Sequence, residues 1–213
     1  MTLTIGLIDY GMGNLHSVNK SFARLKQSVK LIRSPNDLTN SDALVLPGVG
    51  AFDPAMDNLR QTNLIPHIKK WVVNGQPLLG ICLGLQLLFE TSEEGSSEGL
   101  SLFKGHVKKL PSAKNERIPH MGWSIIDSSK NCPILDKQNK NEWMYFVHSY
   151  HACPIEQKDL AATCKFGDNN LTAIVWKDRL GACQFHPEKS SEAGNQMLAK
   201  WIIWLNKGAK IHS

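Results

Sequence analysis

The segment Gly80-Ile81-Cys82-Leu83-Gly84-Leu85-Gln86 joins an apolar, strand-like run at residues 78–81 to a helix-like run at residues 85–89. A cysteine at a strand-to-helix turn, with glycine two residues before it and two after, has the sequence form of a nucleophile elbow. The small neighbours let the backbone turn tightly. The turn brings the thiol to the sheet edge and points it at the first amides of the helix, whose positive partial charge favours the thiolate.

The rest of the N-terminal half alternates apolar strands with helices. Strands are expected at residues 3–8, 29–32, 43–46 and 78–81. Asn14 is expected to cap a helix, and a further helix is expected at about 59–73. Because the strands are continuous apolar runs, the alternation predicts an open, mostly parallel, doubly wound (flavodoxin-like) α/β sheet.

The C-terminal half is richer in strand-like runs, at residues 105–110, 123–126, 143–148, 161–165, 173–176 and 181–185. A hairpin turn is expected at residues 168–170. We expect these runs to add an antiparallel β section onto the parallel sheet, and a last helix at 192–206 to cover it. No linker divides the chain, so residues 1–213 are predicted to form a single domain.

Composition excludes several classes of protein. The 213 residues carry a net charge of +5, but lysine and arginine are scattered rather than gathered in a stripe with aromatic residues, which argues against nucleic-acid binding. The five cysteines form no CxxC pair, no basic leader opens the chain, and no apolar run approaches the ~18 residues of a membrane span. We therefore expect a cytoplasmic protein without a membrane partner.

The chain also offers a base for the thiol. His186 lies in Gln184-Phe185-His186-Pro187-Glu188, and Glu188 can orient the imidazole by accepting from its second ring nitrogen. Cys82 alone would be interpreted as a packed core cysteine, and His186 alone as a structural histidine. Their combination favours a catalytic site. The other four cysteines lack glycine-flanked turns and are interpreted as structural.

Acyl transfer also needs donors for an oxyanion. The backbone amide of Leu83 follows the nucleophile directly. A second donor is expected from Val49 or Gly50, in the segment Pro47-Gly48-Val49-Gly50 that ends a neighbouring strand. The alternative is that this segment is a plain turn.

Taken together, the elbow and the His-Pro-Glu segment resemble the triad-type (class I) glutamine amidotransferases. Further stretches are similar to the glutaminase subunits (HisH) of imidazole glycerol phosphate synthases, and the similarity spans essentially the whole chain. These stretches are Asp9-Tyr10-Gly11-Met12-Gly13-Asn14-Leu15, Leu46-Pro47-Gly48-Val49-Gly50-Ala51-Phe52, Pro119-His120-Met121-Gly122-Trp123 and Tyr145-Phe146-Val147-His148-Ser149-Tyr150.

The resemblance implies hydrolysis of glutamine to glutamate and ammonia through a glutamyl thioester on Cys82, without a cofactor or metal. It also implies that a set of residues holds the substrate: Gly48, Gln86, His148, Ser149 and Tyr150. Independently of the family, Gln86 lies one helical turn after Cys82 and can therefore face the same pocket.

The family's partner is a (β/α)8-barrel cyclase subunit, HisF, which forms a heterodimer and uses the ammonia to make imidazole glycerol phosphate for histidine synthesis. Asn14, Met121, Trp123 and Lys189 match positions at or near that interface. Met121 and Trp123 could instead be core, and Lys189 a solvated charge. The family's glutaminase is nearly silent alone, and a peptide flip at Gly48–Gly50 is one physical account of its activation.

Three other functions remain open at this stage. A paralogous amidotransferase would supply ammonia to another acceptor, such as a surface-polysaccharide sugar. A cysteine peptidase of similar sheet type would lack the His-Pro-Glu segment with glutamine four residues after the cysteine. A binding module with a decayed site would not need an intact Cys82, His186 and Glu188.

Overall fold

A sheet of nine strands organises the computed structural model, which describes residues 2–135 and 142–210. Its first part is parallel, as predicted, and its second part is antiparallel. In spatial order the strands are β2 (Ser28–Ile32), β1 (Thr4–Ile8), β3 (Ala43–Gly48), β4 (Leu78–Cys82), β12 (Leu180–Cys183), β11 (Asn169–Lys177), β10 (Leu160–Phe166), β7 (His120–Ser128) and β8 (Trp143–His148).

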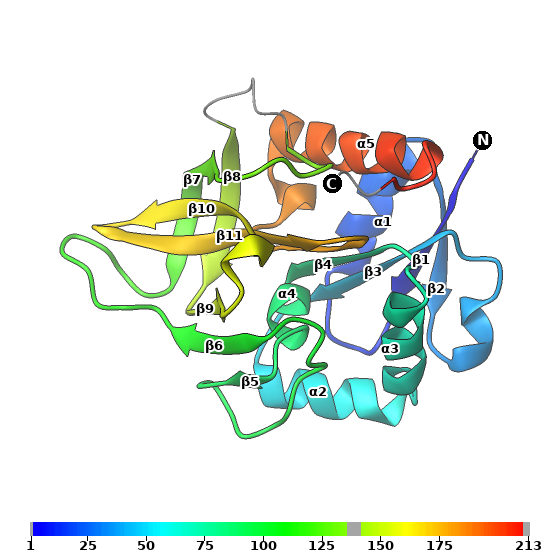
Figure 1. Cartoon of the computed structure of the whole chain (residues 1–213), viewed down its shortest axis with the longest axis horizontal. Helices are drawn as coiled ribbons and strands as arrows, with labels where there is room; N and C mark the ends of the chain where they lie inside the picture. The colour runs from blue at the N-terminus through cyan, green and yellow to red at the C-terminus, as the bar shows by residue number, and fades with distance from the viewer. Residues whose placement is uncertain (1, 136–141, 211–213) are drawn as a thin grey trace.

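Helices cover both faces of the parallel part (Figure 1). One face carries α1 (Leu15–Arg24) and α5 (Ser191–Asn206), and the other carries α2 (Phe52–Gln61), α3 (Ile65–Val73) and the short α4 (Leu83–Leu87). Asn14 caps α1 by accepting a hydrogen bond from the Ser17 amide. Short 3₁₀ turns lie at Pro35–Leu38, Gln157–Asp159 and Pro187–Lys189. The doubly wound architecture is therefore confirmed.

Alternate side chains of the strands enter two separate cores. Val45 of β3 packs in the core below α1 and α5, where the rings of Phe22 and Trp201 lie 5.9 Å apart. Its neighbour Leu44 packs in the opposite core with α2 and α3. Continuous apolar sequence in the parallel strands follows from this burial on both faces.

The antiparallel strands extend the edge of the main sheet and curl back toward its middle. The amide of His186, three residues after β12, donates to the carbonyl of Tyr145 on β8 with an N–O distance of 3.0 Å. Phe146 of β8 meets Phe185 at a ring distance of 5.5 Å inside this curl. As a result, the last strand of the sheet lies beside the segment that carries the predicted base.

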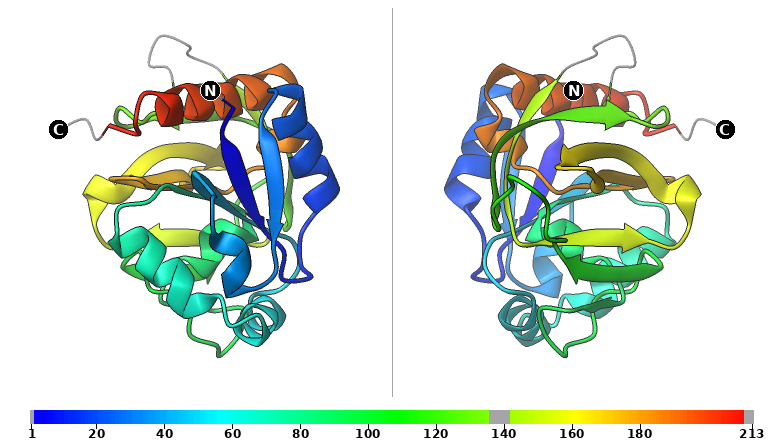
Figure 2. Two further views of the ribbon diagram at one scale, coloured as in Figure 1. Left: turned by 90° about the vertical axis from the view of Figure 1, so that its right-hand side faces the viewer. Right: turned by 90° about the vertical axis from the view of Figure 1, so that its left-hand side faces the viewer.

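A second sheet of three strands was not expected. It contains β5 (Thr91–Ser92), β6 (Gly105–Lys109) and β9 (Tyr150–Pro154), and it forms a separate layer on the α4 side of the main sheet (Figure 2). Val107 and Ala152 join it to the core that contains α4. The strand β9 escaped prediction because Ala152 alone among its residues is fully buried, so the apolar signal is short.

Three local predictions were wrong. The single helix expected at 59–73 is two helices, because Asn63 takes a left-handed backbone with φ = 56° and Pro66 opens the first turn of α3. The strand expected at 181–185 ends at Cys183, and β11 already begins at Asn169, so its hairpin turn lies one or two residues earlier than expected.

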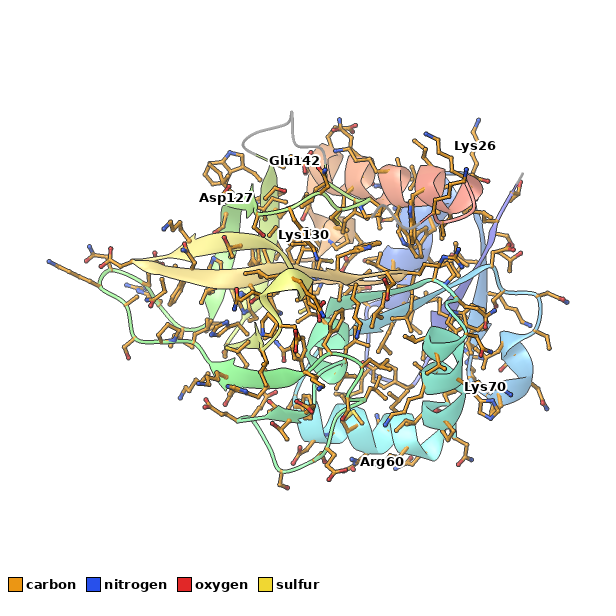
Figure 3. All side chains as sticks on the ribbon, viewed as in Figure 1. Lys26, Arg60, Lys70, Asp127, Lys130 and Glu142 are labelled. Carbon is orange, nitrogen blue, oxygen red and sulfur yellow. The ribbon has the colours of Figure 1, made fainter. Side chains whose placement is uncertain are left out.

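Charged side chains lie around the outline of the molecule rather than in one band. Lys26, in the turn after α1, Arg60 on α2 and Lys70 on α3 all point outward (Figure 3). None of the helices in the described part of the chain combines the length and the apolar character that crossing a membrane requires.

The turn between β4 and α4 is tightly packed against β3. Cys82 has φ = 55° and ψ = −111°, a conformation rarely adopted by a residue with a side chain. Two residues later, the backbone of Gly84 passes so close to the Leu46 carbonyl of β3 that no side chain fits between them. The helix can start directly after the cysteine only because this position is glycine.

We expect Gly84→Ala to lower the free energy of unfolding by about 1–3 kcal/mol, because the added methyl group overlaps the backbone of Leu46. Gly13→Ala is the matched control, since its added carbon meets its nearest neighbour at an ordinary 3.4 Å. Urea unfolding followed by circular dichroism measures both. Equal stability of the two variants would show that the close approach is not needed.

Candidate active site

Three segments of the chain end at one edge of the sheet. Gly48 at the end of β3 pairs with Cys82 at the end of β4, and β12 pairs with β4 one residue earlier, through Cys183 and Ile81. His186 follows β12 by three residues. The carboxyl ends of parallel strands therefore gather the predicted nucleophile, base and oxyanion segment, as expected for an open α/β sheet.

A pocket of about 280 Å³ lies at this edge. It is lined by most of the residues predicted from the sequence and by three others, Glu94, Pro119 and Val147. The predicted residues are Val49, Gly50, Cys82, Leu83, Gln86, His148, Ser149, Tyr150, His186 and Lys189. The size suits a small molecule rather than a polymer.

His186 and Glu188 form a buried ion pair. Nδ1 of His186 lies 2.7 Å from Oε1 of Glu188, and the two side chains are 2% and 1% exposed. Burial lowers the pKa of His186, but hydrogen bonding and charge attraction from Cys82 and Glu188 outweigh it and raise this pKa to about 10. Nε2 of His186 is buried without a hydrogen-bond partner of ordinary geometry among the described residues. This nitrogen is therefore free to exchange a proton with the Cys82 thiol or with a ligand.

Two buried amides connect Cys82 to the far wall of the pocket. Nε2 of Gln184 lies 3.9 Å from Sγ of Cys82, and Oε1 of Gln184 accepts from Nε2 of Gln86 at 3.2 Å. Nε2 of Gln86 also donates to the Tyr150 carbonyl at 2.9 Å. Because both hydrogens of that amide are used, Gln86 presents its oxygen to the pocket, where it can accept from an ammonium group.

Gln184 was not singled out from the sequence as a site residue. It is fully buried and stands two residues before the base on the same extended segment. A fully buried glutamine whose two ends both meet polar atoms of the site is a functional candidate. In the sequence its only signal is the position beside Phe185-His186.

Gly48 lies beneath the pocket rather than in its lining. It is buried, and a side chain there would strike the hydroxyl of Tyr10 and the Cβ of Leu83. Tyr10 Oη in turn donates to the Pro47 carbonyl at 2.8 Å. Gly48 is thus packed under the elbow and is not among the residues that line the pocket, and its contact with glutamine stays a prediction.

Val49 and Gly50 follow the segment that Tyr10 holds through the Pro47 carbonyl. Val49 is 39% exposed, and Gly50 has φ = 100°, which only glycine adopts freely. The Pro47 carbonyl is therefore held by a buried hydroxyl, whereas the two residues after Gly48 lie at the surface.

Glu94 is a further pocket residue that the sequence analysis did not single out. Oε2 of Glu94 accepts from the Phe52 amide at 2.9 Å, and the side chain lines the pocket. Burial raises the pKa of Glu94, and the nearby Asp53 adds to the shift. A carboxylate here complements the positive charge of an amino-acid ligand.

The predicted interface residues lie outside or at the rim of the pocket. Met121 and Trp123 are 63% and 45% exposed, so the alternative that they are core is wrong. Lys189 is exposed and lines the pocket, and Asn14 is half-buried as the cap of α1. Within the described part of the chain, no group of three or more His, Cys, Asp or Glu side chains is arranged to hold a metal ion.

Comparison with known proteins identifies close relatives of the chain. A sequence model described as "Glutamine amidotransferase class-I" matches residues 6–204. The "Imidazole glycerol phosphate synthase subunit HisH" of Prochlorococcus marinus (strain MIT 9211) is 63% identical over 97% of both chains. The protein with the same description from Synechococcus sp. (strain CC9605) is 59% identical over 99% of both chains.

Solved structures show the same fold at low sequence identity. The "Structure of PurLQS from Thermotoga maritima" matches with a TM-score of 0.76 and 16% identity, over 96% of this chain and 100% of that chain. A structure described as "a putative gmp synthase subunit a protein" from Thermoplasma acidophilum matches with a TM-score of 0.73 and 19% identity, over 98% of this chain and 96% of that chain. These similarities concern the fold alone.

We expect Glu188→Gln to lower the pKa of His186 by about 1–3 units, because a neutral amide no longer stabilises the imidazolium. NMR titration of ¹³C,¹⁵N-histidine-labelled protein measures this directly. The control is Glu142→Gln, which removes another buried carboxylate, one that pairs with Lys200 at 3.1 Å. An unchanged titration of His186 in Glu188→Gln would contradict the pairing.

The raised pKa of His186 should also make the free energy of unfolding depend on pH. Because the folded protein raises the pKa of His186 above its ordinary 6.5, the pair stabilises the fold fully below that pH and loses its contribution as the pH rises toward about 10. The difference in unfolding free energy between wild type and Glu188→Gln should therefore shrink between pH 6.5 and 10. A difference that grows over this range would have the wrong sign.

Proposed function

We propose, because the chain belongs to the class-I glutamine amidotransferases and within them to the HisH family, that residues 1–213 form one glutaminase domain. In this proposal, the reaction takes place on Cys82. The enzyme is the glutaminase subunit of an imidazole glycerol phosphate synthase in histidine biosynthesis. The observation that supports the site is the elbow itself: a buried cysteine with φ = 55° beside a carboxylate-paired histidine.

The proposed reaction starts with a proton transfer from Cys82 to His186. The thiolate then attacks the side-chain carboxamide of glutamine, and a carbon–sulfur bond forms. The imidazolium gives its proton to the departing nitrogen, so ammonia leaves and a glutamyl thioester remains. Water, deprotonated by His186, attacks the thioester, and glutamate and the free thiol are released. Glu188 holds the ring and stabilises its charged form throughout.

When the thiolate attacks, negative charge develops on the carboxamide oxygen of glutamine, and hydrogen-bond donors must lie beside it at the same edge of the sheet. The amide of Leu83 belongs to the first residue of α4, where the helix dipole adds to its effect. We assign the second donor to Val49 or Gly50, which follow the strand paired with Cys82. Loss of one such donor typically lowers the rate about 100- to 1,000-fold.

Opposite charges at the rim fit the two ends of free glutamine. Glu94 and the oxygen of Gln86 complement the α-ammonium group. The Ser149–Tyr150 segment, fixed by His148, and the cationic Lys189 complement the α-carboxylate. A peptide-bound glutamine lacks both charges, which favours the free amino acid as substrate.

Exposed apolar residues on β7 and β8 form a row of cross-strand pairs, which we call the apolar ladder, and this row favours a docking surface for a partner. Its cross-strand pairs are Met121 with Val147, Trp123 with Tyr145 and Ile125 with Trp143. Met121, Trp123, Ile125 and Trp143 are 63%, 45%, 37% and 50% exposed. We propose that this face docks the (β/α)8 subunit HisF, which receives the ammonia. Val147 belongs both to the ladder and to the pocket wall, so a partner seated there would lie next to the site.

Activation by the partner is proposed to act on the peptides after Gly48. Tyr10 holds the Pro47 carbonyl, whereas Val49 and Gly50 are exposed and Gly50 is already in a left-handed conformation. Flipping one of these peptides exchanges a carbonyl for an amide donor at the oxyanion position. The isolated subunit would then lack a donor until the partner binds.

We expect an electrophilic glutamine analogue, a diazo-ketone, to label Cys82 alone among the five cysteines. Peptide mass spectrometry locates the adduct. Cys82→Ala should abolish labelling, and Cys183→Ala, which changes a fully buried cysteine on the next strand, should not. An adduct on any other cysteine, with Cys82 unmodified, would contradict the assignment of the nucleophile.

We expect a HisF barrel subunit with its acceptor nucleotide to accelerate glutamate release by about 100-fold or more, the size of one oxyanion donor. A coupled assay for glutamate, with and without partner, measures this. Trp123→Ala should weaken partner binding more than Lys26→Ala, whose side chain lies on the far side of the molecule. If the isolated protein turns over saturating glutamine as fast as the complex, the gating proposal fails.

A further inference from the structure

A buried histidine on β7 has no role in the reaction described above. His120 is 7% exposed and lies on the inner side of β7, beside the exposed residues that make up the apolar ladder. Its ring stacks on Phe146 at 5.0 Å and meets Phe166 at 5.3 Å. A phenylalanine would fill this space without a cost for burying two ring nitrogens, so a histidine here calls for polar partners.

Both ring nitrogens of His120 have such partners. Nδ1 of His120 lies 3.1 Å from Nε2 of His148, and Nε2 of His120 lies 2.9 Å from the hydroxyl of Ser124. On its other side, Nδ1 of His148 lies 2.9 Å from the Tyr150 carbonyl. Four groups thus form one continuous chain from β7 to the glutamine-binding segment.

The directions of these hydrogen bonds follow from chemistry. The Tyr150 carbonyl can only accept, so Nδ1 of His148 carries the hydrogen. Burial lowers the pKa of His148 to about 3, so its ring is neutral and its Nε2 accepts from His120. Burial also lowers the pKa of His120, whose Nε2 then accepts from the Ser124 hydroxyl. Both histidines are therefore neutral and protonated on Nδ1.

The Tyr150 carbonyl is where this chain meets the nucleophile. It accepts from His148 and from Nε2 of Gln86, each at 2.9 Å, which uses both of its lone pairs. From Gln86 the contacts continue through Gln184 to the sulfur of Cys82. His120 is thus connected by hydrogen bonds, through His148 and Tyr150, to Gln86 in the wall of the pocket.

We propose that His120 is a positioning residue for glutamine hydrolysis, which holds His148 in the tautomer that fixes the Tyr150 carbonyl and Gln86 and thereby links the outer face of β7 to the active site. The positioning of the substrate groups is a property of the isolated chain. The link to the outer face rests on the proposed function, since it needs the partner on Met121 and Trp123. A partner that contacts Met121 can shift the backbone of β7 at His120, because His120 is the residue next to Met121 on that strand.

Two substitutions separate the hydrogen bond from the packing. His120→Phe keeps an aromatic ring between Phe146 and Phe166 but removes the donor to His148. His120→Asn keeps a donor at the position of Nδ1. His106→Phe on β6 is the control, because His106 is a half-buried strand histidine that does not line the pocket. Thermal unfolding establishes that all three variants fold.

Glutamine binding is measured by calorimetry in a Cys82→Ala background, so that no turnover occurs. We expect His120→Phe to weaken glutamine binding about tenfold, His120→Asn about twofold or less, and His106→Phe not at all. A merely structural role would lower the melting temperature without changing the dissociation constant of the folded protein. Equal affinity of His120→Phe and its parent would overturn the proposal.

NMR of ¹⁵N-histidine-labelled wild-type protein provides an independent readout. The proposal requires both rings to be neutral at about pH 7, with hydrogen on Nδ1 and a bare Nε2, whereas free histidine favours hydrogen on Nε2. Signals are assigned from His120→Asn and His148→Asn. A hydrogen on Nε2 of His148 would contradict the chain of donors.

The link to β7 is tested in the complex with the barrel subunit. We expect His120→Phe to bind the partner within about twofold of wild type but to lose most of the activation of glutamate release. Full activation of His120→Phe would overturn the link. If no barrel subunit activates even the wild type, the partner proposal fails, while the binding and NMR experiments still decide the positioning role.

Discussion

The backbone contact between Gly84 and the Leu46 carbonyl is the constraint on which the rest of the site depends. It lets α4 start directly after Cys82, and the left-handed backbone of that residue is the geometric consequence. The register of β3 and β4 then places Gly48 beside Cys82, so the segment that would bind the oxyanion begins at the nucleophile. The strained backbone of Cys82 is stable because β4, which ends at this residue, is paired with β3 on one side and with β12 on the other.

A second constraint is the curl of the antiparallel strands. Although β8 is the last strand in the order of the sheet, the bond from the His186 amide to the Tyr145 carbonyl and the packing of Phe146 on Phe185 hold it beside the segment of the base. The curl gives the pocket one wall from the parallel half and one from the antiparallel half. It also explains why a face suited to docking, on β7 and β8, adjoins the pocket: the same strands form both.

Local sequence patterns predicted the parts of this protein that are governed by local physics. The strands at 3–8 and 143–148, the Asn14 cap and the paired His186 and Glu188 each depend on neighbours in sequence. The residues that were missed act across long separations. Glu94 reaches the amide of Phe52, 42 residues away, and Gln184 reaches Cys82, 102 residues away. Neither contact leaves a periodic signal, so only the folded chain reveals it.

Two histidines in one pocket show how the fold assigns opposite tasks to the same residue type. Both are buried, and burial alone lowers a histidine pKa. His148 has a carbonyl and a neutral ring as partners, so burial dominates and its pKa falls to about 3. His186 has Glu188 at 2.7 Å and the Cys82 sulfur nearby, so charge dominates and its pKa rises to about 10. A ring that stays neutral cannot serve as the acid for a leaving group at about pH 7, whereas it holds a carbonyl reliably. The protonated ring supplies the acid. The partners of each histidine, rather than its exposure, therefore decide which one positions the substrate and which one moves the proton.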